Sequence, residues 1–197
     1  MFITIRTGLV IGALTSALTV AQSAYGACPA PAKVVVDRCS SRGPSDLQAL
    51  QSRAISCVGA QEYGRAIATF TEALRAGCTV ATCMANRGRA KISLGDIDGA
   101  LADFGEIARS GAKPPNRYMA IAFYKKKDFD RAIAAADDAL RGSSDDAEAL
   151  YLRGLAKAGK GDPSGGRVDQ EAAQSMDARS KFPAGNLQQL FECTHRI

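Results

Sequence analysis

Three aspartates near Gly99, namely Asp96, Asp98 and Asp103, form the polar cluster of this sequence that most suggests metal binding. In the segment GDIDGALADF, Asp96 and Asp98 have the spacing of the first and third ligands of a calcium-binding loop between two helices. Such a loop also needs an acid at its fifth position, glycine at its sixth and a bidentate glutamate at its twelfth. The chain has Ala100, Leu101 and Ile107 at these places. The missing ligands argue against a calcium site.

Cysteine and histidine offer a second candidate metal site. Cys78-x4-Cys83 and Cys193-x-His195 together hold the donor types of a three-cysteine, one-histidine zinc site. The alternative is oxidation, and we favour it, because disulfides are the usual state of cysteine in exported proteins. We therefore expect no metal site.

The sequence contains no recognisable catalytic constellation. His195 is the only histidine, no Cys-x-x-Cys pair occurs, and neither RGRAK nor GKGDPSGG has the spacing of a phosphate-binding loop. No nucleophile is accompanied by an acid–base partner. We expect a protein that is not an enzyme and uses no cofactor.

Residues 1–26 have the pattern of an export signal. An early cation, Arg6, precedes a short apolar run, and the small-x-small sequence Ala24-Tyr25-Gly26 follows it. The run is too short for a membrane span and no stop-transfer charges follow it. We predict cleavage near Gly26, export to the periplasm or the medium, and no membrane span in the mature chain.

The net charge is mildly positive. The formal charge is +5 at pH 7, and removal of residues 1–26, with one arginine and no acid, leaves +4. The cations are scattered, whereas nucleic-acid binding needs a clustered basic face with stacking aromatics. We expect no nucleic-acid partner. With 46% apolar residues, 6% aromatic residues and no Trp, the composition favours helices packed through small residues.

All six cysteines follow the predicted cleavage site, and we take them as disulfide candidates: Cys28, Cys39, Cys57, Cys78, Cys83 and Cys193. Six cysteines allow fifteen connectivities. A Cys28–Cys39 bridge would close a short loop and stabilise by about 3 kcal/mol. Cys57 is either a buried thiol or the partner of Cys39 or Cys193. A short Cys78–Cys83 link is geometrically easy. Lipidation of Cys28 stays open.

An internal repeat organises the rest of the chain. Three segments align on Ala66, Ala100 and Ala132, which are 34 and then 32 residues apart, and each has a small residue twelve positions earlier. A fourth copy begins with LYLRGLAKAGKGD, which parallels MANRGRAKISLGD and places Gly154 opposite Gly88. Each copy has apolar residues at helical spacing in two segments. The pattern predicts stacked helical hairpins.

These copies resemble the tetratricopeptide repeat, which has small residues at positions 8 and 20 and an aromatic at 24, as in Phe70 and Phe104. Its usual Trp is replaced by Leu50, Met84, Asn116 and Leu150. The resemblance implies an all-α, short right-handed α-α superhelix of three to four hairpins over residues 45–180. The copies span about 47–80, 81–112, 113–146 and 147–180. We expect a cysteine-containing arm at 27–44 and a capping helix within 181–197, with Asn186 as N-cap before Leu187, Leu190 and Phe191.

Two local expectations follow from the alignment. Asp96 and its counterpart Asp128 should cap the second helix of their hairpins. In the fourth copy, Gly165 and Gly166 should each cost a helix interior about 1 kcal/mol relative to alanine. We therefore predict that its second helix frays or starts late.

In this family the concave groove binds proteins or extended peptides through first-helix side chains. The matching residues are Arg89, Ile92, Arg117, Ile121, Tyr124, Tyr151 and Leu155. Arginine and tyrosine suit a peptide with an acidic group. Gln51 and Ile55 replace the Lys and Asn of the family's chaperone-binding clamp, so that function is not expected. The sequence predicts a non-catalytic binding scaffold of the periplasm or envelope. The alternative is a disulfide-stabilised structural or self-assembling envelope or secreted protein.

Overall fold

The computed structural model describes residue 39 and residues 46–178. The predicted signal segment and capping helix, and all of the predicted arm except Cys39, lie outside these residues. The described part contains α-helices and no strands, and none of its helices is long and apolar enough to cross a membrane. The helices are α2 (Leu47–Gly59), α3 (Tyr63–Arg75), α4 (Val80–Leu94), α5 (Ile97–Arg109), α6 (Asn116–Lys125), α7 (Phe129–Gly142), α8 (Ala147–Lys160) and α9 (Pro163–Ala178).

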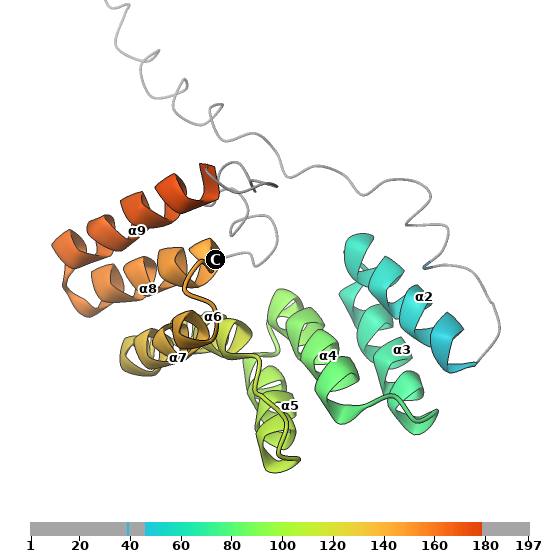
Figure 1. Ribbon diagram of the computed structural model, residues 1–197. Coiled ribbons are helices and arrows are strands. Elements are labelled where there is room, and N and C mark those ends of the chain that lie inside the picture. Colours follow the sequence, from blue (N-terminus) through green and yellow to red (C-terminus); the bar gives the residue numbers. More distant parts are fainter. Residues whose placement is uncertain (1–38, 40–45, 179–197) are drawn as a thin grey trace, which may run out of the picture.

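The helices form four hairpins, α2–α3, α4–α5, α6–α7 and α8–α9, which follow one another through the molecule (Figure 1). Each first helix also packs against the second helix of the preceding hairpin, most narrowly where α6 meets α5. The predicted all-α solenoid of helical hairpins is confirmed.

Two features recur in the hairpin turns, a residue with positive φ and an acidic residue before the second helix. A residue with positive φ follows every first helix: Gln61, Gly95, Lys127 and Gly161. An acid stands at the start of every second helix (Glu62, Asp96, Asp128 and Asp162), and in all but the first hairpin its carboxylate accepts a backbone hydrogen bond. The Asp96 carboxylate accepts a hydrogen bond from the Gly99 N–H at 3.0 Å, and Asp128 accepts one from the Arg131 N–H at 3.2 Å. The predicted caps are confirmed, and they satisfy backbone donors that have no partner inside the helix.

Small residues let the two helices of a hairpin approach closely. A Cβ at Gly88 in α4 would lie 2.4 Å from Cε1 of Phe104 in α5. In the fourth hairpin, a Cβ at Gly154 would lie 2.6 Å from the carbonyl oxygen of Gly166. The small residues found by aligning the sequence are therefore helix-crossing points.

The prediction that the last second helix frays or starts late is wrong. Helix α9 begins at Pro163 and runs for 16 residues. Proline at the first helical position costs no hydrogen bond, and the Asp162 carboxylate accepts one from the Gly165 N–H at 2.8 Å. Gly165 and Gly166 lie in the first turn, and Gly166 makes the close contact with Gly154 possible.

The core consists of two apolar clusters that meet at α4. One lies among α2, α3 and α4 around Leu50 and Phe70, and the other extends from α4 to α9 around Phe104 and Leu152. Cys83 and Ala90 of α4 belong to the first cluster and Ile92 to the second, so α4 couples the two.

Two disulfides hold the first cluster. Cys39 pairs with Cys57 of α2, and Cys78 pairs with Cys83 across the turn between α3 and α4. The alternative of a Cys28–Cys39 bridge is therefore wrong, and Cys57 is the partner of Cys39. Oxidised Cys78 and Cys83 have no thiolate to give a zinc ion. Cys28, Cys193 and His195 lie outside the described residues.

Candidate functional site

Three of the seven predicted groove residues are core residues. Ile92, Ile121 and Tyr151 are 1%, 0% and 4% exposed, and all three belong to the cluster around Phe104. Apolar side chains at these first-helix positions pack between neighbouring helices, where burial gains more than solvent exposure. A partner cannot reach them without repacking the core.

The other four predicted residues are half-buried on successive first helices. Arg89 lies on α4, Arg117 and Tyr124 on α6, and Leu155 on α8. The structure adds a residue that the repeat positions do not mark, Tyr118. The guanidinium carbons of Arg89 and Arg117 lie 5.9 and 5.5 Å from the centroid of its ring. Both distances suit cation–π attraction.

We call Arg89, Tyr118 and Arg117 the Arg–Tyr strip. It crosses from α4 to α6 and therefore joins the second and third hairpins. Sequence reasoning placed both arginines on one surface but could not place the ring between them, because that depends on the angle at which the hairpins stack.

The two arginines differ in their surroundings. Arg117 forms ion pairs with Asp146 and Glu148 of the next hairpin, at 3.3 and 3.0 Å. Burial acts to lower the pKa of Arg117, and the charges of Glu148 and Asp146 outweigh it, so this pKa is raised overall. Arg89 makes no ion pair with any carboxylate in the described part of the chain.

Two buried charge clusters were not anticipated. In the second hairpin, Asp103 pairs with Arg87 and Lys91 of α4 at 2.7 and 3.1 Å. In the fourth, Asp169 pairs with the corresponding Arg153 and Lys157 at 2.7 and 2.8 Å. We call these the Arg–Lys–Asp clusters. The sequence pattern RG-x-AK occurs at residues 87–91 and again 66 residues later, and this repetition could have pointed to the two clusters.

The Arg–Lys–Asp clusters connect the two helices of a hairpin. Each aspartate is on a second helix and both of its cations are on the first helix of the same hairpin. The pKa of Arg153 is raised, chiefly by its hydrogen bond to Asp169. Burial acts to raise the pKa of Asp169, but Arg153 and Lys157 lower it overall. Arg153 and Asp169 therefore hold their charges and make poor proton donors or acceptors.

The aspartates that suggested calcium point elsewhere. Asp96 caps α5, and Asp98 forms an ion pair with Lys126 of the next hairpin. Among residues 46–178 and Cys39, no group of three His, Cys, Asp or Glu side chains is placed to hold a metal ion.

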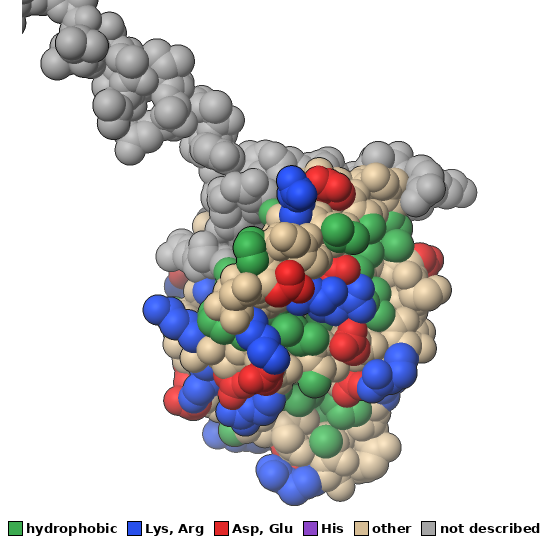
Figure 2. Space-filling model, turned by 90° about the vertical axis from the view of Figure 1, so that its left-hand side faces the viewer, with side chains coloured by type: hydrophobic (Ala, Val, Ile, Leu, Met, Phe, Trp, Pro, Cys, Tyr) green, Lys and Arg blue, Asp and Glu red, His purple; other side chains and the backbone are tan. Residues whose placement is uncertain are grey.

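The surface on the side of α7 to α9 carries positive and negative side chains mixed together, with small apolar areas between them (Figure 2). No large area of one sign is visible on this face.

Comparison with known proteins identifies the repeat. The family model described as tetratricopeptide repeat matches residues 117–179, which cover most of the third and fourth hairpins. No curated protein matches the chain. The family resemblance found from the sequence is therefore confirmed over these two hairpins.

Proposed function

We propose that this tetratricopeptide-repeat protein is a non-catalytic scaffold that binds another protein or an extended peptide through its first helices, in the periplasm or cell envelope. The repeat is typical of protein-interaction scaffolds. Stacked hairpins give such proteins extended binding surfaces. The observation that carries the proposal is the Arg–Tyr strip, which crosses two hairpins and contains a cation without a described carboxylate partner.

The chemistry of the strip favours a partner with an acidic side chain beside an apolar one. A guanidinium binds a carboxylate through two parallel hydrogen bonds. Tyrosine supplies rigid contact area with little loss of conformational entropy, as in many interface hot spots. Arg89 supplies the guanidinium and Tyr118 supplies the contact area. The ion pairs of Arg117 with Asp146 and Glu148 hold that side chain in place.

A non-catalytic role is supported by how the buried charges are used. Asp103 and Asp169 are both saturated by an arginine and a lysine. These carboxylates connect the second helix of a hairpin to its first helix, so their ion pairs have a structural use.

Export is supported by the two disulfides. Bridges of this kind form and persist in oxidising compartments and are rare in the cytosol. Cys39–Cys57 and Cys78–Cys83 both lie in the first half of the chain, where they hold the smaller core cluster.

Site-specific photocrosslinking tests the proposal. A photoreactive phenylalanine analogue replaces Ala85, one turn before Arg89 on α4, in one variant and Arg109, an exposed residue of α5, in a matched control. After export in the native cell, the Ala85 variant should give a discrete crosslinked product that the Arg109 variant lacks. Addition of Arg75→Glu on α3 should leave the product unchanged. Equal products from both crosslinker positions would rule out the strip as the binding surface.

A further inference from the structure

The junction between the second and third hairpins differs from the other two junctions between hairpins. Helix α5 meets α6 over the narrowest contact between consecutive helices in the described part of the chain. Six residues, 110–115, connect these two helices, whereas residues 76–79 and 143–146, four each, make the other two connections. Helix α6 is also the shortest of the first helices, and it begins only after Pro114 and Pro115. The second and third hairpins are therefore joined more loosely than their neighbours.

A hydrogen bond that ties the other two junctions has no counterpart at this one. Arg87 and Arg153 each donate to the second helix of the preceding hairpin, at 3.1 and 2.8 Å. In the repeat alignment the corresponding residue of α6 is Met119, and the residue of α5 that should accept is Gly105. Neither has a side chain that could form this bond.

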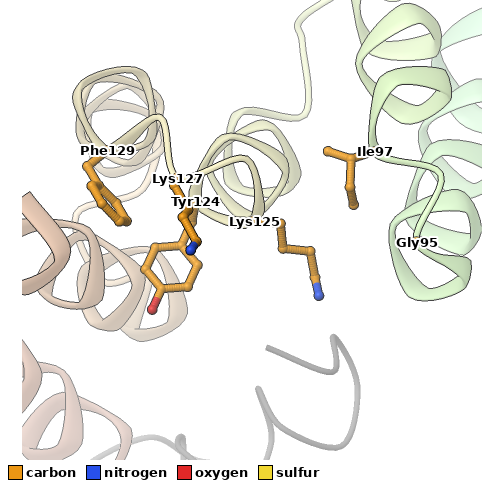
Figure 3. A pocket seen from close by; sticks show the side chains of 6 residues that line it. All are labelled: Gly95, Ile97, Tyr124, Lys125, Lys127 and Phe129. Atoms are coloured by element: carbon orange, nitrogen blue, oxygen red, sulfur yellow. The ribbon is translucent and has the colours of Figure 1, made fainter.

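The junction is open at the end where the hairpin turns lie. A hollow of about 420 Å³ is lined from the second hairpin by Gly95 and Ile97, and from the third by Tyr124, Lys125, Lys127 and Phe129. Lys125 and the end of α6 lie between Ile97 and the rings of Tyr124 and Phe129 (Figure 3). These apolar groups are thus held apart and do not close the hollow.

The end of the junction at the linker, residues 110–115, is packed. Ile107, near the end of α5, is fully buried, and Ala112 of the linker packs against the same apolar cluster. Helices joined by a short connection run in opposite directions, so this packed end lies away from the hollow. The junction therefore has the form of a wedge. A rotation about the linker would widen or narrow the hollow with little change at the packed end.

An exposed ion pair spans the open end. Lys126, directly after α6, pairs with Asp98 in the first turn of α5. The side chain of Asp98 is 83% exposed and that of Lys126 is 38% exposed. Exposed pairs of this kind contribute little to stability and are screened by salt. This pair can therefore hold the wedge closed and yet release it readily.

We propose that this junction is a hinge, with the linker as its pivot and the Asp98–Lys126 pair as its latch, and that its angle regulates the Arg–Tyr strip. The strip crosses the same junction, because the Arg89 guanidinium of α4 lies over the Tyr118 ring of α6. A change of hinge angle moves Arg89 relative to Tyr118, so a partner that contacts both favours one angle. This regulatory role rests on the proposed function, whereas the hinge itself does not.

Distances between spin labels, measured by pulsed electron paramagnetic resonance on the exported chain, test the hinge. A keto amino acid that carries the label leaves the native disulfides intact. It replaces pairs of exposed, repeat-equivalent residues that each span one junction: Ala68 with Ala102, Ala102 with Ala134, and Ala134 with Val168. The Ala102–Ala134 distance distribution should be at least twofold wider than the other two. Equal widths for the three pairs would overturn the hinge.

Charge reversal tests the latch. Asp98→Lys sets two lysines against each other, so it should lengthen the mean Ala102–Ala134 distance and leave the other two distances unchanged. Asp98→Lys combined with Lys126→Asp restores opposite charges and should return the wild-type distance. An Ala102–Ala134 distribution that is the same in the wild type and in Asp98→Lys would refute the latch.

Photocrosslinking from Ala85 tests the regulatory role. Asp98→Lys should lower the yield of the partner product at least twofold, and the charge-swapped variant should recover it. An unchanged yield together with a changed label distance would refute regulation of the strip. Absence of the product in the wild type would refute the proposed function and this role with it, while the label distances would still decide the hinge.

Discussion

Arg153 holds the place in α8 that Arg87 holds in α4, and each donates two hydrogen bonds to an aspartate 16 residues later in the chain. Their third contacts also correspond, because Arg87 donates to Thr71 and Arg153 donates to Asp137, both on the preceding hairpin. These equivalences recur at 66 residues, the length of two hairpins. The charged pattern therefore repeats over hairpin pairs, whereas the alanine pattern repeats over single hairpins.

Removal of one cluster carboxylate should be costly. Asp103→Asn leaves Arg87 and Lys91 without their common counter-charge at a site where Asp103 is 5% exposed. We expect a loss of about 2–4 kcal/mol in the free energy of unfolding, measured by urea denaturation.

The matched control for Asp103→Asn is Asp98→Asn, because the Asp98 side chain is 83% exposed in its ion pair with Lys126. The control should change the unfolding free energy by less than about 1 kcal/mol. Equal losses in the two variants would mean that burial of the Asp103 cluster contributes nothing.

The Arg–Lys–Asp cluster of the fourth hairpin should make the free energy of unfolding depend on pH through Asp169. Arg153 and Lys157 hold the folded pKa of Asp169 below its ordinary value, against the opposing effect of burial. The stabilisation is therefore present above the unfolded pKa of about 4 and is lost as the pH falls through the lower folded pKa. Urea midpoints should fall between pH 5 and pH 3 in the wild type, and by a smaller amount in Asp169→Asn. The same fall in both proteins would contradict this role.

The helix crossing at Gly88 should not tolerate a methyl group. Gly88→Ala would place Cβ 2.4 Å from the buried Phe104 ring, and we expect a loss of about 1–3 kcal/mol in the free energy of unfolding. Addition of Phe104→Leu should recover part of this loss, because the residues are in direct contact. Gly64→Ala in α3 meets nothing within 4 Å and should stabilise by up to about 1 kcal/mol. Calorimetry of the four proteins measures these effects, and a neutral Gly88→Ala would refute the crossing argument.

The alanine and glycine repeats predicted the hairpins correctly because small residues at fixed spacing are a local requirement of close helix crossing. Asp96 was predictable as a cap for the same reason, since its partner Gly99 lies three residues away. The failure at α9 came from counting the cost of Gly165 and Gly166 without the Asp162 cap and the contact with Gly154.

The groove was harder to predict because it depends on how hairpins stack. Ile92, Ile121 and Tyr151 occupy positions that line the groove in the family, yet they are buried here. A small change in the angle between stacked hairpins rotates such positions into the core. No short sequence pattern specifies that angle. The pairing of Arg87 with Asp103 was missed for a related reason, because it needs the rotation of two helices about their axes.

Oxidised protein should contain few free thiols. Cys39–Cys57 and Cys78–Cys83 account for four of the six cysteines, so thiol titration of the denatured, exported chain should find at most two. Replacement of Cys39 and Cys57 together by serine should cost about 3 kcal/mol in unfolding free energy on the loop-entropy model. The shorter Cys78–Cys83 loop should cost about 2 kcal/mol on the same model. Titration of four or more thiols would contradict the pairing.

Charge reversal should separate the two arginines of the Arg–Tyr strip. Arg117→Glu sets a third carboxylate beside Asp146 and Glu148, so we expect a loss of about 1 kcal/mol in unfolding free energy, with the side chain's 34% exposure limiting the cost. Arg89→Glu breaks no described ion pair and should leave the unfolding free energy within about 0.5 kcal/mol of the wild type. Arg89→Glu should nevertheless abolish crosslinking of the partner from a photoreactive residue at Ala85, one turn earlier on α4. A folded Arg89→Glu protein that still captures the same partner would show that the Arg89 guanidinium does not bind it.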